Sequence, residues 1–466
     1  MIPAGGAYAL FADMGTGKTI TTIAIMGRLF LDGRIRRALV VAPSSVCAVW
    51  PAECRKFAGF PVRVGVLLGE RDKRLSVLRY LSAPTLPGTG EALRVAVINY
   101  ESTWRLEEEL AKFKPDMIIC DESQRIKGAT AQQSKAMHRL GASIPYKMIL
   151  TGTPIQNDTR DLWSQYRFLA PGIFNASYYA FLKRYAVMGG VGNHQYLGPR
   201  NLEELTRKAH SIAYRVTKDE CLDLPEKTFE ERAILFDEKT RRLYKRIQRE
   251  SYAALEGGEE VTVNNVLTRL LRLQQLTGGF LTDDEGGVQC VTTAKLDALE
   301  DIVQSCCVDE GKKLVIFARF RPELAAIQQR IAAVFARVKS TAPLKQVAIW
   351  GDIPIPQRGA IVDQFQDDPC TRAFVGQIDA CAEGITLNAA TTTLYYSVTW
   401  NLAKYQQSQD RTHRIGVSGP CLYIHLIVPG TIDRQIMAAL EKKEHLAKSV
   451  VDNWKALLTE TEEDNP

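Results

Sequence analysis

The stretch 12–19 reads ADMGTGKT, and it stands between an apolar run and a segment with apolar residues at helical spacing. Gly15 and Gly17 let the backbone come close to phosphate oxygens, because no Cβ is in the way. A helix that begins directly after the loop points its free N–H groups at an anion. The order of strand, loop and helix therefore predicts a phosphate-binding loop, in which Lys18 reaches the β- and γ-phosphates and Thr19 ligates Mg²⁺.

An acidic pair supports this prediction. Asp121 and Glu122 follow the apolar run 117–120, which reads as a buried strand. A carboxylate at the carboxyl end of a strand in the same sheet can hold Mg²⁺, which makes Asp121 the candidate metal ligand together with Thr19. The neighbouring Glu122 can orient and deprotonate the attacking water, so it is the candidate general base. The expected cofactors are ATP and Mg²⁺.

A basic segment in the second half of the chain, 407–416, reads QSQDRTHRIG. Arg411 and Arg414 are three residues apart, so the spacing places both on one face of a predicted helix. An arginine that enters from a second domain can neutralise the charge that develops on the γ-phosphoryl group, which makes both arginines candidate catalytic residues. ATP would then hold two domains together until hydrolysis releases them. A basic surface helix is the alternative interpretation.

The apolar runs of the first half are typical of parallel strands that are buried on both faces and joined by helices. These runs are 8–12, 38–42, 95–98, 117–120 and 147–150. The same rhythm returns later, where the predicted strands are 314–318, 373–378, 394–396 and 423–428. Between the two halves, the stretch 158–265 lacks regular strand runs and reads mostly as helices and loops. The predicted fold class is α/β, with two parallel-sheet lobes and helical insertions.

This pattern divides the chain into four segments. Residues 1–157 are expected to form the ATP-binding lobe, and residues 158–290 the helical insertions and the linker between the lobes. Residues 291–440 are expected to form the second lobe, and residues 441–466 a C-terminal helix with an acidic tail.

The composition fits a globular protein of two or three domains. The chain has 466 residues, 45% of them hydrophobic and 24% charged, which does not favour disorder. The formal net charge of +6 is compatible with a polyanionic partner. No CxxC pair occurs among the ten cysteines, so a zinc ribbon or finger is not expected. A reducing, cytoplasmic compartment fits best, since the sequence shows no secretory signal and no apolar run of transmembrane length.

Eight segments, in this order, resemble the helicase motifs of superfamily 2, and most closely those of the Swi/Snf-type double-stranded DNA translocases. The segments similar to motifs I, Ia, Ib and II are DMGTGKT (13–19), VVAPSSVCAVW (40–50), INYES (98–102) and DESQRIK (121–127). Those similar to motifs III to VI are LTGTPIQN (150–157), LVIFARF (314–320), AEGITLNAA (382–390) and QSQDRTHRIG (407–416). The stretches that favour the Swi/Snf-type group are DLW (161–163), FLAPG (168–172) and RVTKDECLDLPEKT (215–228). The resemblance covers nearly the whole chain.

The resemblance implies two RecA-like lobes, a helicase ATP-binding domain and a helicase C-terminal domain, with ATP hydrolysed at the cleft between them. Members of this group track along double-stranded DNA and generally do not separate its strands. The implied nucleotide-binding residues are Met14, Gly15, Thr16, Gly17, Lys18, Thr19, Gln124 and Gly384. The residues implied to line the DNA path are Ser44, Ser45, Asn99, Tyr100, Thr151, Thr153, Arg319, Thr386 and Asn388. Such contacts position the duplex through its phosphates and carry little sequence information.

Two departures from the family pattern concern the nucleotide site. Gln124 replaces the usual histidine of motif II, and glutamine can donate and accept hydrogen bonds but cannot titrate. We therefore expect retained hydrolysis with altered coupling to nucleic acid. Only eleven residues precede Ala12, where the family has a helical segment that recognises adenine. We expect the start of this chain to be truncated.

The expected function is ATP-dependent translocation on double-stranded DNA. The chain is expected to be monomeric in isolation and not to bind a membrane. Protein partners that direct it are left open. The expected location is the cytoplasm of a bacterium or of a virus-infected cell, or the nucleus in a eukaryote. Three alternatives remain at this stage: a strand-separating DNA or RNA helicase, the ATPase subunit of a restriction or antiviral complex, and an ATP-binding scaffold without turnover. The scaffold is disfavoured by the presence of Lys18, Asp121, Glu122 and both arginines.

Overall fold

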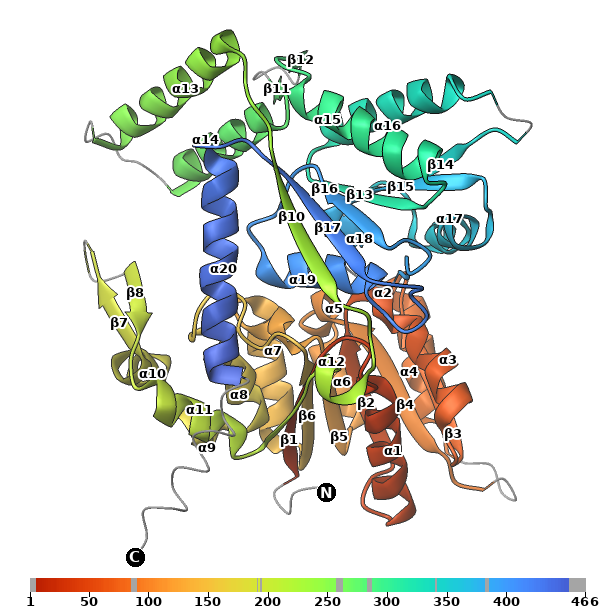
Figure 1. The fold of residues 1–466 in the computed structure, drawn as a ribbon. Coiled ribbons are helices and arrows are strands. Elements are labelled where there is room, and N and C mark those ends of the chain that lie inside the picture. Colours follow the sequence, from red (N-terminus) through yellow and green to blue (C-terminus); the bar gives the residue numbers. More distant parts are fainter. Residues whose placement is uncertain are drawn as a thin grey trace, which may run out of the picture. The chain divides into compact units, whose positions relative to one another are not determined.

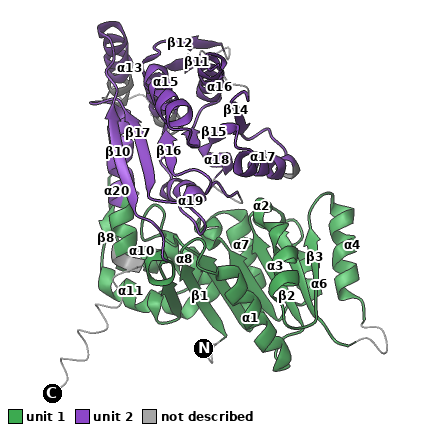
Figure 2. Ribbon diagram, turned by 45° about the vertical axis from the view of Figure 1, so that its right-hand side comes forward, with its two compact units in different colours: residues 1–222, 443–466 green, residues 223–442 purple. Residues whose placement is uncertain are grey.

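The computed structural model describes residues 6–84, 90–190, 192, 195–256, 263–282, 287–339, 342–381 and 385–451. The chain divides into two compact units (Figure 1, Figure 2). Unit 1 contains Met1–Leu222 and Lys443–Pro466, and unit 2 contains Asp223–Lys442. The predicted linker 158–290 is thus split, because its residues up to Leu222 belong to unit 1 and the rest to unit 2.

Unit 1 is built around a seven-stranded sheet in which all neighbouring strands are parallel. The strand order is β3-β4-β2-β5-β6-β1-β9. The strands are β1 (Ala7–Ala12), β2 (Arg37–Ala42), β3 (Val62–Leu67), β4 (Leu93–Asn99), β5 (Met117–Asp121), β6 (Tyr146–Thr151) and β9 (Ala213–Val216). A separate antiparallel hairpin consists of β7 (Ala186–Gly189) and β8 (Gln195–Pro199).

Helices and two short 3-10 turns connect these strands. The helices are α1 (Lys18–Leu31), α2 (Ser44–Cys47), α3 (Val49–Phe57), α4 (Arg71–Ser82), α5 (Tyr100–Thr103), α6 (Glu107–Phe113), α7 (Gln132–Leu140), α8 (Asp161–Leu169), α9 (Pro171–Phe174), α10 (Tyr178–Tyr185), α11 (Leu202–His210) and α12 (Lys218–Cys221). The turns are η1 (Ser123–Ile126) and η2 (Gly141–Ser143). Successive residues of the central strand β2 alternate between two apolar clusters, Leu39 and Val41 in one and Val40 and Ala42 in the other. Because side chains alternate across a strand, the sheet is buried on both faces, as predicted.

Unit 2 contains a six-stranded sheet, again with all neighbours parallel, in the order β10-β17-β16-β13-β15-β14. Its strands are β10 (Lys227–Ala233), β13 (Leu314–Ala318), β14 (Lys345–Ile349), β15 (Thr371–Gln377), β16 (Thr392–Tyr395) and β17 (Cys421–Ile427), with a hairpin of β11 (Phe280–Thr282) and β12 (Val288–Cys290). Its helices are α13 (Glu238–Glu256), α14 (Val263–Thr277), α15 (Ala294–Val303), the π-helical turn η4 (Gln304–Asp309), α16 (Arg321–Ala336), α17 (Ile355–Asp367), α18 (Ile378–Cys381) and α19 (Leu402–Thr412). The last helix, α20 (Ile432–Val451), begins in unit 2, and its residues from Lys443 onward belong to unit 1.

All nine predicted strands occur, each with ends within two residues of the prediction. The prediction that 158–265 lacks strands is wrong, because this stretch contributes β9 and β10 to the two sheets, besides the hairpin. Four strands of the two main sheets were not predicted: β3, β9, β10 and β14. Each of them is the outermost strand of its sheet. An outermost strand is less covered and needs no continuous apolar run, so the signal that revealed the central strands is missing there.

None of the helices in the described part of the chain has an apolar stretch long enough to cross a lipid bilayer.

Candidate functional site

The predicted phosphate-binding loop lies between β1 and α1 in unit 1. Gly15 and Gly17 have φ angles of 85° and 90°, a left-handed conformation that disfavours residues with a Cβ. A Cβ on Gly15 would meet open space, so backbone conformation rather than crowding calls for glycine there. α1 begins at Lys18 directly after this turn, and the first N–H groups of a helix have no partner within it. Met14 and Thr16 lie in the same loop, and Thr19 is the second residue of α1.

The Lys18 ammonium is hydrogen-bonded to the backbone at the start of the loop. It donates hydrogen bonds to the carbonyl oxygens of Ala12, at 2.8 Å, and of Asp13, at 3.1 Å. The Thr16 hydroxyl donates to the same Asp13 oxygen at 2.8 Å. A phosphate at this position would replace neutral acceptors by charged ones, and charge-assisted hydrogen bonds are the stronger kind.

Asp121 stands at the carboxyl end of β5 and is 6% exposed. Its carboxylate accepts a hydrogen bond from the Trp50 indole N–H at 3.2 Å. Burial, and then the negative charge of Glu122, raise the pKa of Asp121 to about 7, while Lys18 and Trp50 oppose the rise. Lys18, the first residue of α1, therefore acts on the pKa of Asp121, the last residue of β5, from a different element of unit 1. A buried carboxylate of this kind is stabilised as an anion by a cation.

Glu122 has an unusual backbone conformation. Its φ of 53° lies in the left-handed region, which costs a residue with a side chain about 1–3 kcal/mol. The Gln124 side-chain amide donates a hydrogen bond to the Glu122 carboxylate at 2.6 Å. Gln124 is 6% exposed, and its own carbonyl oxygen has no hydrogen-bond partner among the described residues. The residue that replaces the usual histidine thus holds the candidate base.

Mg²⁺ fits the residues at this site. Within the described ranges, no group of three or more His, Cys, Asp or Glu could hold a metal ion. Magnesium in nucleotide sites takes one or two protein oxygens, and phosphates and waters supply the rest. Asp121, a buried carboxylate under the influence of Lys18, and the Thr19 hydroxyl at the start of α1 match that pattern.

The residues of unit 1 that are predicted to contact nucleic acid lie at or just after the carboxyl ends of β2, β4 and β6, at the edge of the sheet where α/β proteins bind ligands. They are Ser44, Ser45, Asn99, Tyr100, Thr151 and Thr153. Tyr100 has no exposed surface, and its hydroxyl donates to the Asp121 carbonyl at 2.8 Å. Thr151 is equally buried, and its hydroxyl accepts the Thr153 N–H at 3.0 Å. The side chains of Tyr100 and Thr151 therefore stabilise the ends of strands. Ser44, Ser45 and Thr153 are partly exposed.

In unit 2, two of the predicted segments are joined by hydrogen bonds. Arg411 donates to the Ile385 carbonyl at 3.1 Å, and Arg414 donates to the Thr386 hydroxyl at 3.0 Å. The Asn388 side-chain amide donates to the backbone just beyond Arg414 at 3.0 Å. The candidate arginines and two of the candidate DNA contacts therefore form one connected group.

The prediction that both arginines share one helix face is wrong. α19 ends at Thr412, and the next residue, His413, has a ψ of 83° that is incompatible with a helix. Arg411 is on the helix and 2% exposed, whereas Arg414 lies in the following turn and is partly exposed. Arg414 is therefore the better placed of the two to meet a ligand.

The Arg319 guanidinium donates to Gln274, its backbone N–H donates to the Ser397 hydroxyl at 2.8 Å, and burial lowers its pKa. Arg319 thus participates in a hydrogen-bond network inside unit 2. Gly384, predicted to bind nucleotide, lies outside the described residues.

His425 supports α19 from β17. Its ring is 1% exposed, stacks on Tyr395 with centroids 4.8 Å apart, and forms a hydrogen bond of 2.9 Å with the Tyr405 hydroxyl of α19. Burial lowers the pKa of His425 to about 4. The imidazole is therefore neutral in the folded chain at pH 7.

Lowering the pH from 6.5 to 4 is expected to destabilise unit 2. Over this range the unfolded chain binds a proton at His425 that the folded chain does not, so the free energy of unfolding falls by up to about 3 kcal/mol. His425→Gln keeps a hydrogen-bonding group without titration and should flatten this dependence. Thermal unfolding at a series of pH values measures it, and equal slopes in both proteins would contradict the assignment.

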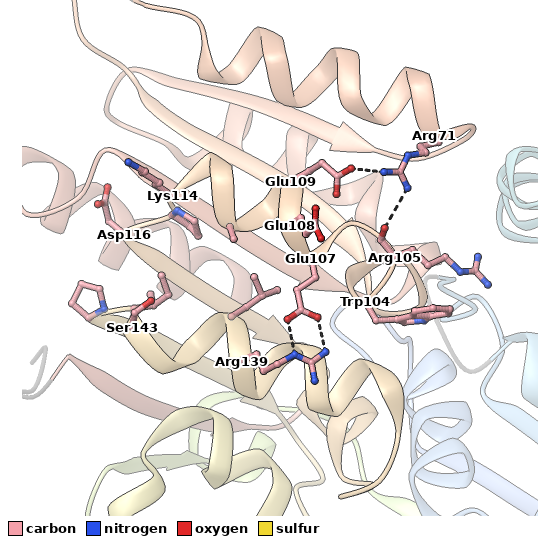
Figure 3. Close-up of a pocket in the computed structure, with 15 residues that line it drawn as sticks. Arg71, Trp104, Arg105, Glu107, Glu108, Glu109, Lys114, Asp116, Arg139 and Ser143 are labelled. Atoms are coloured by element: carbon pink, nitrogen blue, oxygen red, sulfur yellow. Dashed lines mark hydrogen bonds and ion pairs between the residues drawn. The ribbon is translucent and has the colours of Figure 1, made fainter.

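A pocket of about 850 Å³ lies elsewhere in unit 1, before the starts of β5 and β6 (Figure 3). Four of its charged groups form two ion pairs: Arg71 pairs with Glu109, and Arg139 pairs with Glu107 at 2.6 Å. No predicted site residue lines it. Parallel strands place their starts and ends at opposite edges of a sheet, so this pocket is separate from the candidate site.

Two side chains at the candidate site were not predicted. The Trp50 indole reaches Asp121 from a helix 71 residues earlier, and the Arg215 guanidinium reaches Asp13 from a strand 202 residues later. Both lie within stretches that carry the family resemblance, 40–50 and 215–228. Nothing local in the sequence indicates the partner of either residue, because the contacts form only when distant strands assemble.

Comparison with known protein families matches most of the chain. Residues 5–278 match the SNF2-related domain, and residues 294–416 match the helicase conserved C-terminal domain. The chain is 26% identical to the DNA annealing helicase and endonuclease ZRANB3 of Mus musculus, over 97% of this chain and 40% of that protein. It is 24% identical to the DNA repair and recombination protein RDH54 of Saccharomyces cerevisiae, over 94% of this chain and 48% of that protein. The chain thus spans less than half the length of these two relatives.

Among solved structures, the chain is similar to the Sulfolobus solfataricus SWI2/SNF2 ATPase core in complex with dsDNA. The identity is 26%, the alignment covers 98% of this chain and 92% of that one, and the TM-score is 0.42.

Proposed function

Because the chain belongs to the SNF2-related family, we propose that it hydrolyses ATP to drive movement along double-stranded DNA. The observation that carries this proposal is the arrangement in unit 1. There, the glycine loop with Lys18 follows β1, and Asp121 and Glu122 lie at the carboxyl end of β5; both strands pair in parallel with β6, so the loop and the acidic pair share one edge of the sheet. A loop and an acidic pair placed in this way suit phosphoryl transfer from a nucleotide to water.

In the proposed reaction, Lys18 exchanges its backbone acceptors for the β- and γ-phosphates. Asp121 and Thr19 hold Mg²⁺, which supplies neutralisation of charge on the phosphate oxygens. The Glu122 carboxylate takes a proton from the water that attacks the γ-phosphorus, and the Gln124 amide keeps that carboxylate oriented. The bond from the γ-phosphorus to the bridging oxygen breaks, and ADP and inorganic phosphate result.

In the same proposal, Arg411 and Arg414 of unit 2 stabilise the negative charge on the γ-phosphoryl group in the transition state. They lose this partner when phosphate leaves, so ATP binding and phosphate release alternately favour and disfavour association of the two units. Thr386 and Asn388 are hydrogen-bonded to the segment that carries these arginines. A change in the position of either arginine would therefore alter hydrogen bonds that hold two of the proposed DNA contacts.

Duplex DNA is expected to stimulate ATP hydrolysis more than single-stranded DNA or RNA does. Steady-state rates without nucleic acid and with each of the three measure this, with Glu122→Gln as the blank. Displacement of a third strand from a DNA triplex then reports movement along a duplex that stays paired. Stimulation mainly by single strands or RNA would favour a strand-separating helicase, and no hydrolysis under any condition would favour an ATP-binding scaffold.

A further inference from the structure

The Asp13 side chain connects the phosphate-binding loop to the segment through which the chain leaves unit 1. One carboxylate oxygen accepts a hydrogen bond from the Arg215 guanidinium at 2.7 Å, and the other accepts the Lys218 backbone N–H at 3.1 Å. The Asp13 backbone N–H donates to the Val216 carbonyl at 3.0 Å. The loop is therefore tied at three points to residues more than 200 positions later in the chain.

The sheet holds Arg215 in position for this contact. β9 lies parallel to β1, with Arg215 opposite Phe11, and the guanidinium also donates to the carbonyls of Phe11, at 3.4 Å, and Val216, at 3.3 Å. The Arg215 side chain is 9% exposed, and that of Asp13 is 27% exposed. A guanidinium that is this well buried requires an anionic partner in a defined geometry, and Asp13 provides it.

The backbone of Asp13, by contrast, belongs to the nucleotide site. Its carbonyl oxygen accepts the hydrogen bonds of Thr16 and Lys18. Displacement of Asp13 would therefore move one of the acceptors on which the Lys18 ammonium rests. Any movement of Lys18 toward a phosphate likewise changes the hydrogen bonding of Asp13.

The other partner of Asp13 lies at the start of the connection to unit 2. Lys218 is the first residue of α12, whose start is closed by reciprocal hydrogen bonds between Thr217 and Glu220. The chain passes into unit 2 at Asp223. One carboxylate thus joins the loop, the edge strand β9 and the first turn of the connecting segment.

We propose that Arg215 is a positioning residue for nucleotide binding, and that the Arg215–Asp13 pair couples occupancy of the phosphate-binding loop to the order of the segment 215–222. The proposal rests on the proposed function only in taking ATP as the ligand of the loop. Arg215 touches none of the reacting atoms, so its loss changes affinity for nucleotide and leaves the chemical step intact.

Arg215→Met keeps the aliphatic length of the side chain and removes its charge and hydrogen bonds. It is expected to weaken binding of a fluorescent ATP analogue, titrated without DNA, by about tenfold, the equivalent of one charge-assisted hydrogen bond. The KM for ATP rises accordingly, while kcat at saturating ATP stays within about twofold, the pattern of lost ground-state binding. Arg215→Lys, which can still donate to Asp13, recovers part of the affinity. Arg139→Met breaks the Arg139–Glu107 pair beside the separate pocket of Figure 3 and should leave the affinity unchanged.

Amide hydrogen exchange provides the second readout. Saturation with ADP should slow exchange of the amides in 215–222, including the Lys218 N–H that donates to Asp13, and Arg215→Met should abolish this protection. Unchanged nucleotide affinity in an Arg215→Met variant with wild-type thermal stability would overturn the proposal, as would protection that survives the substitution.

If Arg215→Met does not fold, Asp13→Asn tests the same pair, because it alters the more exposed partner. It should reproduce both the loss of affinity and the loss of protection, and normal values of both would overturn the proposal. A failure of the proposed function would show separately, as wild-type protein that binds nucleotide but is not stimulated by duplex DNA.

Discussion

Glu122→Gln is expected to lower kcat for ATP hydrolysis by about 10²- to 10⁴-fold, the usual contribution of a positioned general base. The substitution preserves the size of the side chain and its hydrogen bond with Gln124, because the glutamine oxygen can still accept the Gln124 N–H. It removes the group that takes the proton from the attacking water. Steady-state hydrolysis with saturating ATP and duplex DNA measures the loss.

Nucleotide affinity should change little in this variant, since Lys18 and the loop are untouched. Glu108→Gln is the matched control, because Glu108 is an exposed carboxylate at the separate pocket of unit 1. A Glu122→Gln enzyme with near-normal turnover would remove Glu122 from the reaction and move the role of base to another group.

Arg414→Ala is expected to lower DNA-stimulated kcat by about 10³-fold, near the lower end of what an arginine finger contributes. Arg414 is partly exposed beyond the end of α19, and among the described residues its guanidinium donates to the Thr386 hydroxyl. The substitution therefore removes charge from the transition state with little cost to folding. Arg414→Lys should restore only part of the rate, because an ammonium lacks the planar fork of the guanidinium.

Arg411→Ala should also lower turnover, but at a cost in the stability of unit 2. Arg411 is 2% exposed and donates to the Ile385 backbone, so its removal leaves a buried acceptor without that donor. Comparing the thermal midpoints of the two variants separates catalysis from folding. Arg434→Ala, which removes an exposed arginine paired with Glu231, is the control in unit 2. Equal, near-normal rates in Arg414→Ala and Arg434→Ala would argue against a catalytic arginine at 414.

The central strands could be predicted because a strand that is buried on both faces needs apolar residues at every position. β13, LVIFA, and the part of β5 before Asp121, MIIC, consist of residues that are buried throughout, so each forms a continuous apolar run. β10, KTFEERA, has exposed and partly buried positions without strict alternation at the edge of its sheet, and it carries four charged residues. No periodicity argument on β10 alone separates it from a loop or a short helix.

The candidate site shows a similar division. The left-handed turn at Gly15 and Gly17 could be predicted from the sequence, because glycine adopts this conformation without a steric cost and the apolar spacing after it marks a helix. The position of Arg414 could not, because a spacing of three residues is the same in a helix and in the turn that follows it. The end of α19 is decided by His413, whose ring nitrogen contacts the Pro225 carbonyl at 2.7 Å. That contact depends on the tertiary fold of unit 2.

By itself, the sequence determined the fold class, the central strands, the glycine loop and the acidic pair after β5. These features depend on residues that are neighbours in the chain, so local composition and spacing carry their signal. Only the tertiary structure decided that Tyr100 and Trp50 bind to Asp121 and that Arg215 binds to Asp13. The partners in each pair come from different strands or their connections. Their contact follows from strand order and register, which no local stretch of the sequence specifies.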